Sequence, residues 1–92
     1  MTKWLEDAAD YTRYRAVELL LSKGVKKSAV YVAAEEQLPG FAAASAEAIK
    51  KAHARVKKRI GTAPTFVGEL LDAARYYPDI ATLHLLAAAD RA

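Results

Sequence analysis

The sequence predicts an all-α protein, a compact bundle of about five short helices. Alanine occurs 21 times in its 92 residues, whereas glycine occurs four times and proline three times. This composition makes helix the most favourable backbone conformation over most of the chain. Apolar residues also recur at three- and four-residue spacing, and the glycines and prolines fall mainly where such segments end.

The first predicted helix runs from about Lys3 to Lys23, with Thr2 as its cap and Gly24 as its stop. Its expected core stripe consists of Leu5, Ala8, Ala9, Thr12, Ala16, Leu19 and Leu20. A second apolar flank is formed by Tyr11, Tyr14, Val17 and Leu21. Two flanks predict that other parts of the chain cover this helix on more than one side.

The second predicted helix is short, about Ala29–Leu38, with Ser28 as its expected cap. Pro39 and Gly40 then form the clearest break in the chain. We expect Phe41 to fill part of the core. Residues 42–44 are compatible either with a loop or with an early helical turn.

The third predicted helix starts at Ser45, ends at Gly61 and contains the segment KKAHARVKKR at residues 50–59. At about 100° per residue, its apolar residues form a narrow stripe. The stripe consists of Ile49, Val56 and Ile60, flanked by Ala52 and His53. Lysine and arginine occupy most of the remaining circumference, so the helix should pack on a thin apolar line and present a broad cationic face.

Two further helices are expected after this one. The fourth covers about Pro64–Tyr76 and should turn Phe66, Val67, Leu70, Leu71 and Ala74 inward. Pro78 forces a break, and a fifth helix follows at about Asp79–Asp90. Because the fifth helix is apolar on nearly all sides, we expect it to be buried or to pair with a second copy of the chain. Residues 1–92 are expected to form one domain, with a C-terminal helical pair at about 64–90.

Charge is concentrated in the middle of the chain. Residues 23–61 hold nine of the 14 basic residues and three of the 11 acidic residues, in a chain whose net charge is +3. Within the third predicted helix, Glu47 and Lys51 are the only acid–base pair at i,i+4 spacing. A cationic face without neutralising acids repels itself and attracts polyanions. The sequence therefore indicates a polyanionic partner, or a merely solvated helix face.

Catalytic and metal-binding patterns are missing from the sequence. There is no cysteine, which excludes disulfides, thiolate catalysis and cysteine-based zinc sites. His53 and His84 have no histidine or acid three or four residues away, so we expect no metal site and no cofactor. Serines 22, 28 and 45 sit at expected helix ends, and no base stands at a recognisable spacing from them. We therefore expect a protein that is not an enzyme.

The longest apolar stretches are Leu19–Leu21 and Ile80–Ala89, far short of the roughly 20 residues that span a bilayer. The first ten residues carry three acids and no apolar run typical of a secretory signal. We expect a soluble, cytoplasmic protein with no membrane partner.

The predicted order of elements is a helix, then a short helix that ends at a Pro-Gly turn, then a basic helix. This order resembles the helix-turn-helix superfamily of DNA-binding domains. The resembling segment covers about residues 15–60, roughly half of the chain. In it, Ala33 or Ala34 corresponds to the small residue of the positioning helix and Gly40 to the turn. Ile49 and Val56 correspond to the buried anchors of the recognition helix.

The resemblance implies a role for each exposed residue of the basic helix. Its N-terminal part would read bases, through Glu47, Lys50, Lys51 and Ala54. Its later cations would hold phosphates, namely Lys57, Lys58 and Arg59, and Arg55 is a further expected nucleic-acid contact. A second phosphate contact is expected at the start of the preceding helix, from Lys26, Lys27 and Ser28.

Two functions are consistent with this pattern. The first is a small protein that binds duplex DNA through residues 45–60, as a transcriptional regulator or accessory factor and as a homodimer through the C-terminal helices. The second is a small protein-binding module or inhibitor, of the kind that phages and plasmids encode, whose basic helix docks on an acidic protein surface. A structural part of a larger assembly is a third option.

Overall fold

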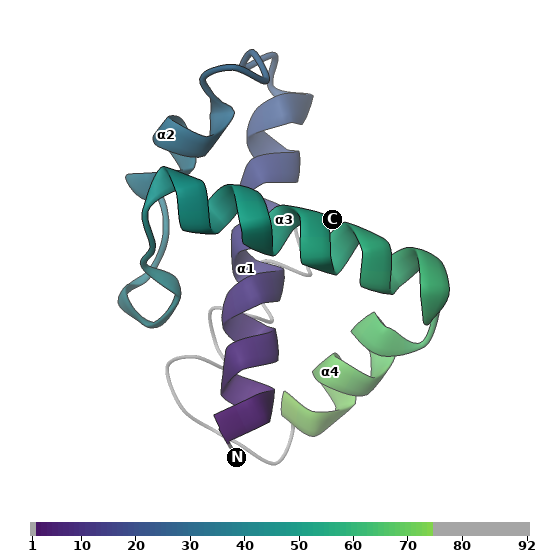
Figure 1. Cartoon of the computed structure of the whole chain (residues 1–92). Coiled ribbons are helices and arrows are strands. Elements are labelled where there is room, and N and C mark those ends of the chain that lie inside the picture. Colours follow the sequence, from purple (N-terminus) through teal and green to yellow (C-terminus); the bar gives the residue numbers. More distant parts are fainter. Residues whose placement is uncertain (1, 75–92) are drawn as a thin grey trace.

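A computed structural model describes the backbone of residues 2–74 and the side chains of residues 6–70. It contains four α-helices: α1 (Thr2–Ser22), α2 (Val30–Glu35), α3 (Ala46–Thr62) and α4 (Phe66–Ala74). A 3-10 turn, η1 (Gly40–Ala42), lies between α2 and α3 (Figure 1). The all-α prediction is confirmed, and the described part of the chain holds four α-helices. The fifth predicted helix, Asp79–Asp90, lies outside the described residues.

Helix α1 is the centre of the fold. It contacts α2, α3, α4 and η1. Helix α3 crosses it steeply, with α2 near one end of α1 and α4 near the other (Figure 1). Over residues 2–74, no helix combines the length and the apolar character needed to cross a membrane.

Gly24 ends α1 as predicted, through a Schellman motif. Its φ of +93° lies in the left-handed region that favours glycine. The Gly24 amide donates to the Leu21 carbonyl at 3.0 Å, and the Val25 amide reaches back to the Leu20 carbonyl at 3.1 Å. Val25 also packs on the buried cluster that contains Leu20, so the chain turns sharply towards α2.

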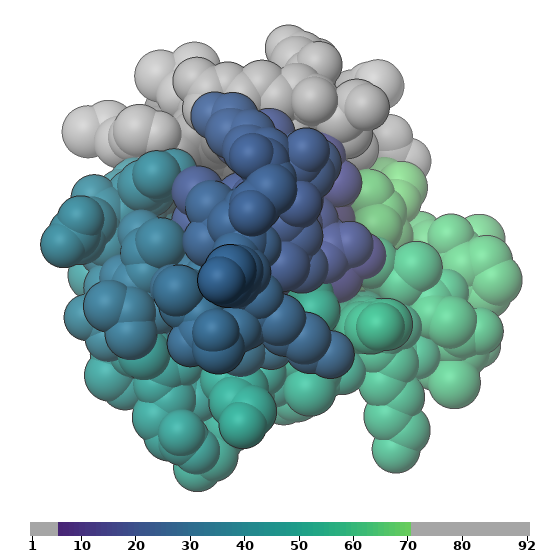
Figure 2. Space-filling view, turned by 90° about the horizontal axis from the view of Figure 1, so that it is seen from above, coloured from purple at the N-terminus to yellow at the C-terminus, as the bar shows by residue number. Residues whose placement is uncertain are grey.

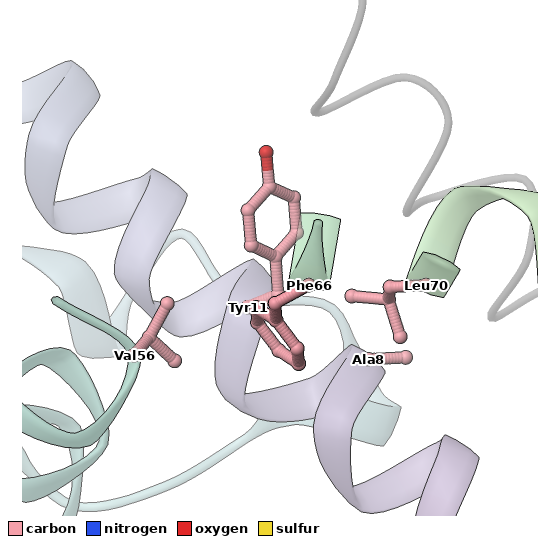
Figure 3. Close-up of a cluster of buried hydrophobic side chains, with 5 residues drawn as sticks. All are labelled: Ala8, Tyr11, Val56, Phe66 and Leu70. Carbon is pink, nitrogen blue, oxygen red and sulfur yellow. The ribbon is translucent and has the colours of Figure 1, made fainter. Parts of the chain in front are cut away.

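The core has two apolar clusters, and both contain residues of α1 and α3. The first consists of Ala8, Tyr11, Val56, Phe66 and Leu70, and it joins α4 to the pair (Figure 3). The second consists of Val17, Leu20, Val30, Ala34 and Ile49, and it joins α2. The predicted anchors Ile49 and Val56 of the basic helix are both buried, one in each cluster.

The predicted core stripe of α1 is correct in part. Ala8, Ala9, Thr12 and Leu20 are buried, whereas Ala16 and Leu19 are half-buried. Tyr11 and Val17, which the sequence placed on the second flank, are as deeply buried as the stripe itself. The reason is that α1 is enclosed by α2, α3 and α4, as its two apolar flanks indicated.

The second helix is shorter than predicted. It covers Val30–Glu35 instead of Ala29–Leu38, and its N-cap is Ala29, with no side-chain cap hydrogen bond. The prediction that Ser28 caps this helix is therefore wrong, because Ser28 lies one residue before the cap. After the Pro39–Gly40 break, η1 buries Ala42 and packs a half-buried Phe41 against the first cluster.

Helix α3 begins as predicted. The Ser45 hydroxyl accepts a hydrogen bond from the Ala48 amide at 3.2 Å. The helix continues through Gly61 to Thr62, so the predicted stop at Gly61 is wrong. Helix α4 starts at Phe66 rather than Pro64, because Pro64 and Thr65 form the turn between α3 and α4.

Two valines of α2 test the second cluster with a built-in control. Val30 is fully buried, whereas Val32 is 61% exposed. Val30→Ala should lower the free energy of unfolding by about 2 kcal/mol, because it removes buried methyl groups and leaves a cavity. Val32→Ala should change it by less than about 0.5 kcal/mol. Urea unfolding of both variants measures the difference, and equal effects would contradict this packing.

Tyr11 makes stability depend on pH in the alkaline range. Burial raises the pKa of its phenol above 10.0, against the opposing effect of the nearby Arg15 charge. Figure 3 shows the ring beside the other members of the cluster, with its hydroxyl oxygen at the outer end. As pH rises above 10, the unfolded chain releases this proton before the folded chain does, so the stability that Tyr11 contributes below pH 10 is lost.

We therefore expect the stability difference between the wild type and Tyr11→Phe to become smaller, or to reverse, between pH 8 and pH 11. Phenylalanine keeps the apolar ring but has no proton to release. Urea unfolding at the two pH values measures this change. The same difference at both values would show that the folded environment does not perturb the phenol.

Candidate nucleic-acid interface

The basic helix α3 has a buried side and an exposed side. Its buried residues are Ile49, Ala52, His53 and Val56, which face the rest of the fold. The exposed side carries Lys50, Lys51, Lys57 and Lys58, which together we call the lysine face. Ala54, a predicted contact residue, is exposed on the same side. No ion pair involves the lysine face within the described residues, and in Figure 2 several side chains of α3 project beyond the surrounding surface.

The two arginines of α3 lie at the edge of this face and are paired with α1. Arg55 binds the Asp10 carboxylate through two nitrogens, with Nε 3.2 Å from Oδ2 and Nη2 3.1 Å from Oδ1. This two-point geometry is the strongest form of an arginine–carboxylate contact. Arg55 is thus a structural link between α1 and α3 as well as a cation.

Asp10 also extends this link to the turn η1. Its Oδ1 accepts a hydrogen bond from Arg13 Nη1 at 2.9 Å. The Nε of Arg13 donates in turn to the Ala42 carbonyl at 2.8 Å. One carboxylate therefore holds two guanidinium groups, and the pair connects three elements of the fold.

Arg59 is held in a similar way, one turn further along α3. Its Nη1 lies 3.1 Å from the Asp7 carboxylate. Its guanidinium carbon lies 4.2 Å from the centre of the Phe66 ring, a cation–π contact with the first residue of α4. Two of the six cations of residues 50–59 thus have acidic partners on α1.

These ion pairs correct the interpretation that no acids neutralise the cations of the basic helix. The acids were visible in the sequence as Asp7 and Asp10, three residues apart on the first helix. Their spacing places both carboxylates on one side of α1. The sequence alone did not show which helix this side of α1 would face. Arg55 follows Asp10 by 45 residues, so their contact depends on how the helices pack.

His53 has a partner that its own helix does not supply. The sequence places it beside the apolar stripe of the basic helix; the side chain is buried, and its Nε2 lies 3.0 Å from the Glu18 carboxylate of α1. The Tyr14 ring stacks on the imidazole with 5.1 Å between centres. Burial, followed by the Glu18 charge, raises the pKa of the Tyr14 phenol above 10.0. His53 therefore belongs to the packing of α1 against α3, away from the lysine face.

The predicted second phosphate contact lacks the helix cap that was expected to support it. Lys26, Lys27 and Ser28 are all exposed in the turn between α1 and α2. Ser28 does not cap α2, so a capping hydroxyl and a helix N-terminus do not combine there. Lys26 and Lys27 remain predicted phosphate contacts through their charge alone.

The segments predicted to resemble a helix-turn-helix unit pack together, since α1, α2 and α3 contact one another. Residues 36–45 connect α2 to α3, a longer connection than the turn of three or four residues found in the tight form of the motif. Comparisons with protein-family models, with curated proteins and with solved structures found no match to this chain. The resemblance therefore stays a prediction from the sequence.

Removing the Asp10 charge tests the link between α1 and α3. Asp10→Asn should lower the free energy of unfolding by about 1 kcal/mol in urea at low salt; the value is modest because the Arg55 side chain is 58% exposed. The loss should shrink in 1 M NaCl, where ion pairs are screened. Glu36→Gln is the control, because Glu36 is exposed and has no ion pair in the described part of the chain. Equal losses in the two variants would contradict a structural role for Asp10.

Proposed function

We propose that this chain is a small duplex-DNA-binding protein of the cytoplasm, a transcriptional regulator or accessory factor, and that α3 is its contact helix. The observation that carries the proposal is the lysine face. Four lysines are exposed on one helix, and no acid of the described residues pairs with them. Such a face attracts a polyanion through charge and releases counterions from it on binding.

The shape of α3 supports a duplex as the polyanion. Its 17 residues give a rod about 25 Å long. A helix with its side chains is about as wide as the major groove of B-DNA, which is about 12 Å. The opposite side of α3 is attached to the fold through two arginines, a histidine and both apolar clusters. The exposed lysines therefore project from a helix that is fixed in place.

The proposal includes Lys26 and Lys27 as a second phosphate contact and a homodimer through the C-terminal helices. The two lysines are exposed in the turn after α1. The helices proposed to form the dimer lie largely beyond the described residues, so the dimer rests on the apolar character of about residues 79–90 in the sequence.

A salt titration tests this function. The protein is titrated against an unrelated duplex of about 20 base pairs at several salt concentrations. We expect log K to fall linearly with log salt, and the four lysines of α3 should contribute about −4 to that slope if they meet phosphates. In the Lys50/Lys51/Lys57/Lys58→Ala variant, binding should fall at least tenfold at low salt and the slope should become much shallower. Circular dichroism checks that the variant is folded, as expected for exposed positions.

A Lys26/Lys27→Ala variant in the same titration measures the second contact. A slope of log K against log salt that is shallower by about 2 would support this contact. If the wild-type protein fails to bind duplex DNA even at low salt, the proposal is wrong. The docking of α3 on an acidic protein surface would then be the better explanation of the lysine face.

A further inference from the structure

We infer that α3 contacts the sugar–phosphate backbone of both DNA strands and does not read base sequence. This inference rests on the proposed function and adds to it the kind of DNA that the protein accepts. Three features of α3 carry it: the arrangement of the lysines, the chemistry of the strip between them, and the commitment of the arginines to other contacts.

The lysine face consists of two parallel rows. Lys50 and Lys57 are seven residues apart and fall within about 20° of each other on the helix, and Lys51 and Lys58 repeat this arrangement about 100° away. Each row places two ammonium groups about 10 Å apart along the helix axis. A helix lying in a groove with one row towards each side would direct its lysines to the phosphates of both strands.

The strip between the two rows would face the floor of the groove. It contains the exposed residues Glu47, Ala54 and Gly61, again seven residues apart. A Cβ atom placed on Gly61 would meet no atom within 4 Å, so this part of the strip is open. Ala54 and Gly61 offer no hydrogen-bonding side chain to a base edge, and Glu47 offers only an acceptor at one end of the helix.

Arginine is the residue that reads guanine most often, through two parallel hydrogen bonds. Both arginines of α3 already use their guanidinium groups within the fold, Arg55 on Asp10 and Arg59 on Asp7 and Phe66. A contact with a base would require them to leave these partners. The groups that remain are lysine ammonium ions, which act as point charges and fit phosphates without regard to sequence.

This inference changes the roles that the helix-turn-helix resemblance implies for five residues of α3. Lys50 and Lys51 become phosphate contacts instead of base readers, and Ala54 becomes part of an inert strip. Arg55 and Arg59 become positioning residues, which hold α3 on α1 and direct the lysines outwards.

Selection from a randomised duplex tests the inference directly. The full chain is mixed at low salt with duplexes that carry a random central segment of about 12 base pairs, and the bound fraction is sequenced. We expect no motif to be enriched more than about threefold, and unrelated duplexes to compete equally. Enrichment of one motif by tenfold or more would overturn the inference while leaving DNA binding intact. A complete lack of binding would instead overturn the proposed function.

Two variants that each remove two positive charges separate the lysines from the arginines. Lys50/Lys57→Gln should make the salt slope shallower by about 2 and leave thermal stability nearly unchanged. Arg55/Arg59→Gln should leave the slope within about 0.5 of the wild type and lower the melting temperature, which circular dichroism measures. An arginine variant that loses as much slope as the lysine variant would show that the arginines hold phosphates, and would overturn their positioning role.

Discussion

The crossing of α1 and α3 is the contact on which the rest of the fold depends. Three polar pairs mark it, Asp7 with Arg59, Asp10 with Arg55 and Glu18 with His53. Their order runs in opposite directions along the two helices, so the pairs define one register for the crossing. Both apolar clusters contain residues of these two helices. Helix α4 completes the first cluster and α2 completes the second, so both pack against the pair that α1 and α3 form.

The same crossing divides the cations of α3 into two groups with different tasks. The arginines lie on the side that turns towards the acids of α1, and the lysines lie on the side that turns away. This division follows the chemistry of the side chains, because a guanidinium can bind a carboxylate at two points whereas an ammonium is compact and strongly hydrated. Residues 50–59 look like a single block of positive charge in the sequence. In the structure, their arginines bind α1 and their lysines form an exposed face.

Local patterns in the sequence predicted the features that depend on neighbouring residues. The stop at Gly24 and the cap at Ser45 are examples, since each is a hydrogen-bond arrangement within a few residues. The burial of Ile49 and Val56 followed from helical periodicity. The cap at Ser28 failed because α2 begins one residue later than predicted, with Ala29 as its N-cap and no side-chain cap hydrogen bond. The Asp10–Arg55 pair could not be predicted, because a single sequence shows the signs of charges but not which distant ones meet.

The acid–arginine pairs have a consequence for the energetics of folding in the presence of polyanions. They exist only in the native state, so an unfolded chain offers the guanidinium groups of Arg55 and Arg59 to any polyanion, in addition to its lysines. A ligand that binds the unfolded chain as well as the native one stabilises the native state less. Folding therefore lowers the number of cations available to a polyanion while it arranges the remaining ones on one surface. In this chain, folding leaves fewer free cations than the unfolded chain has, but it places the remaining lysines together on one face of α3.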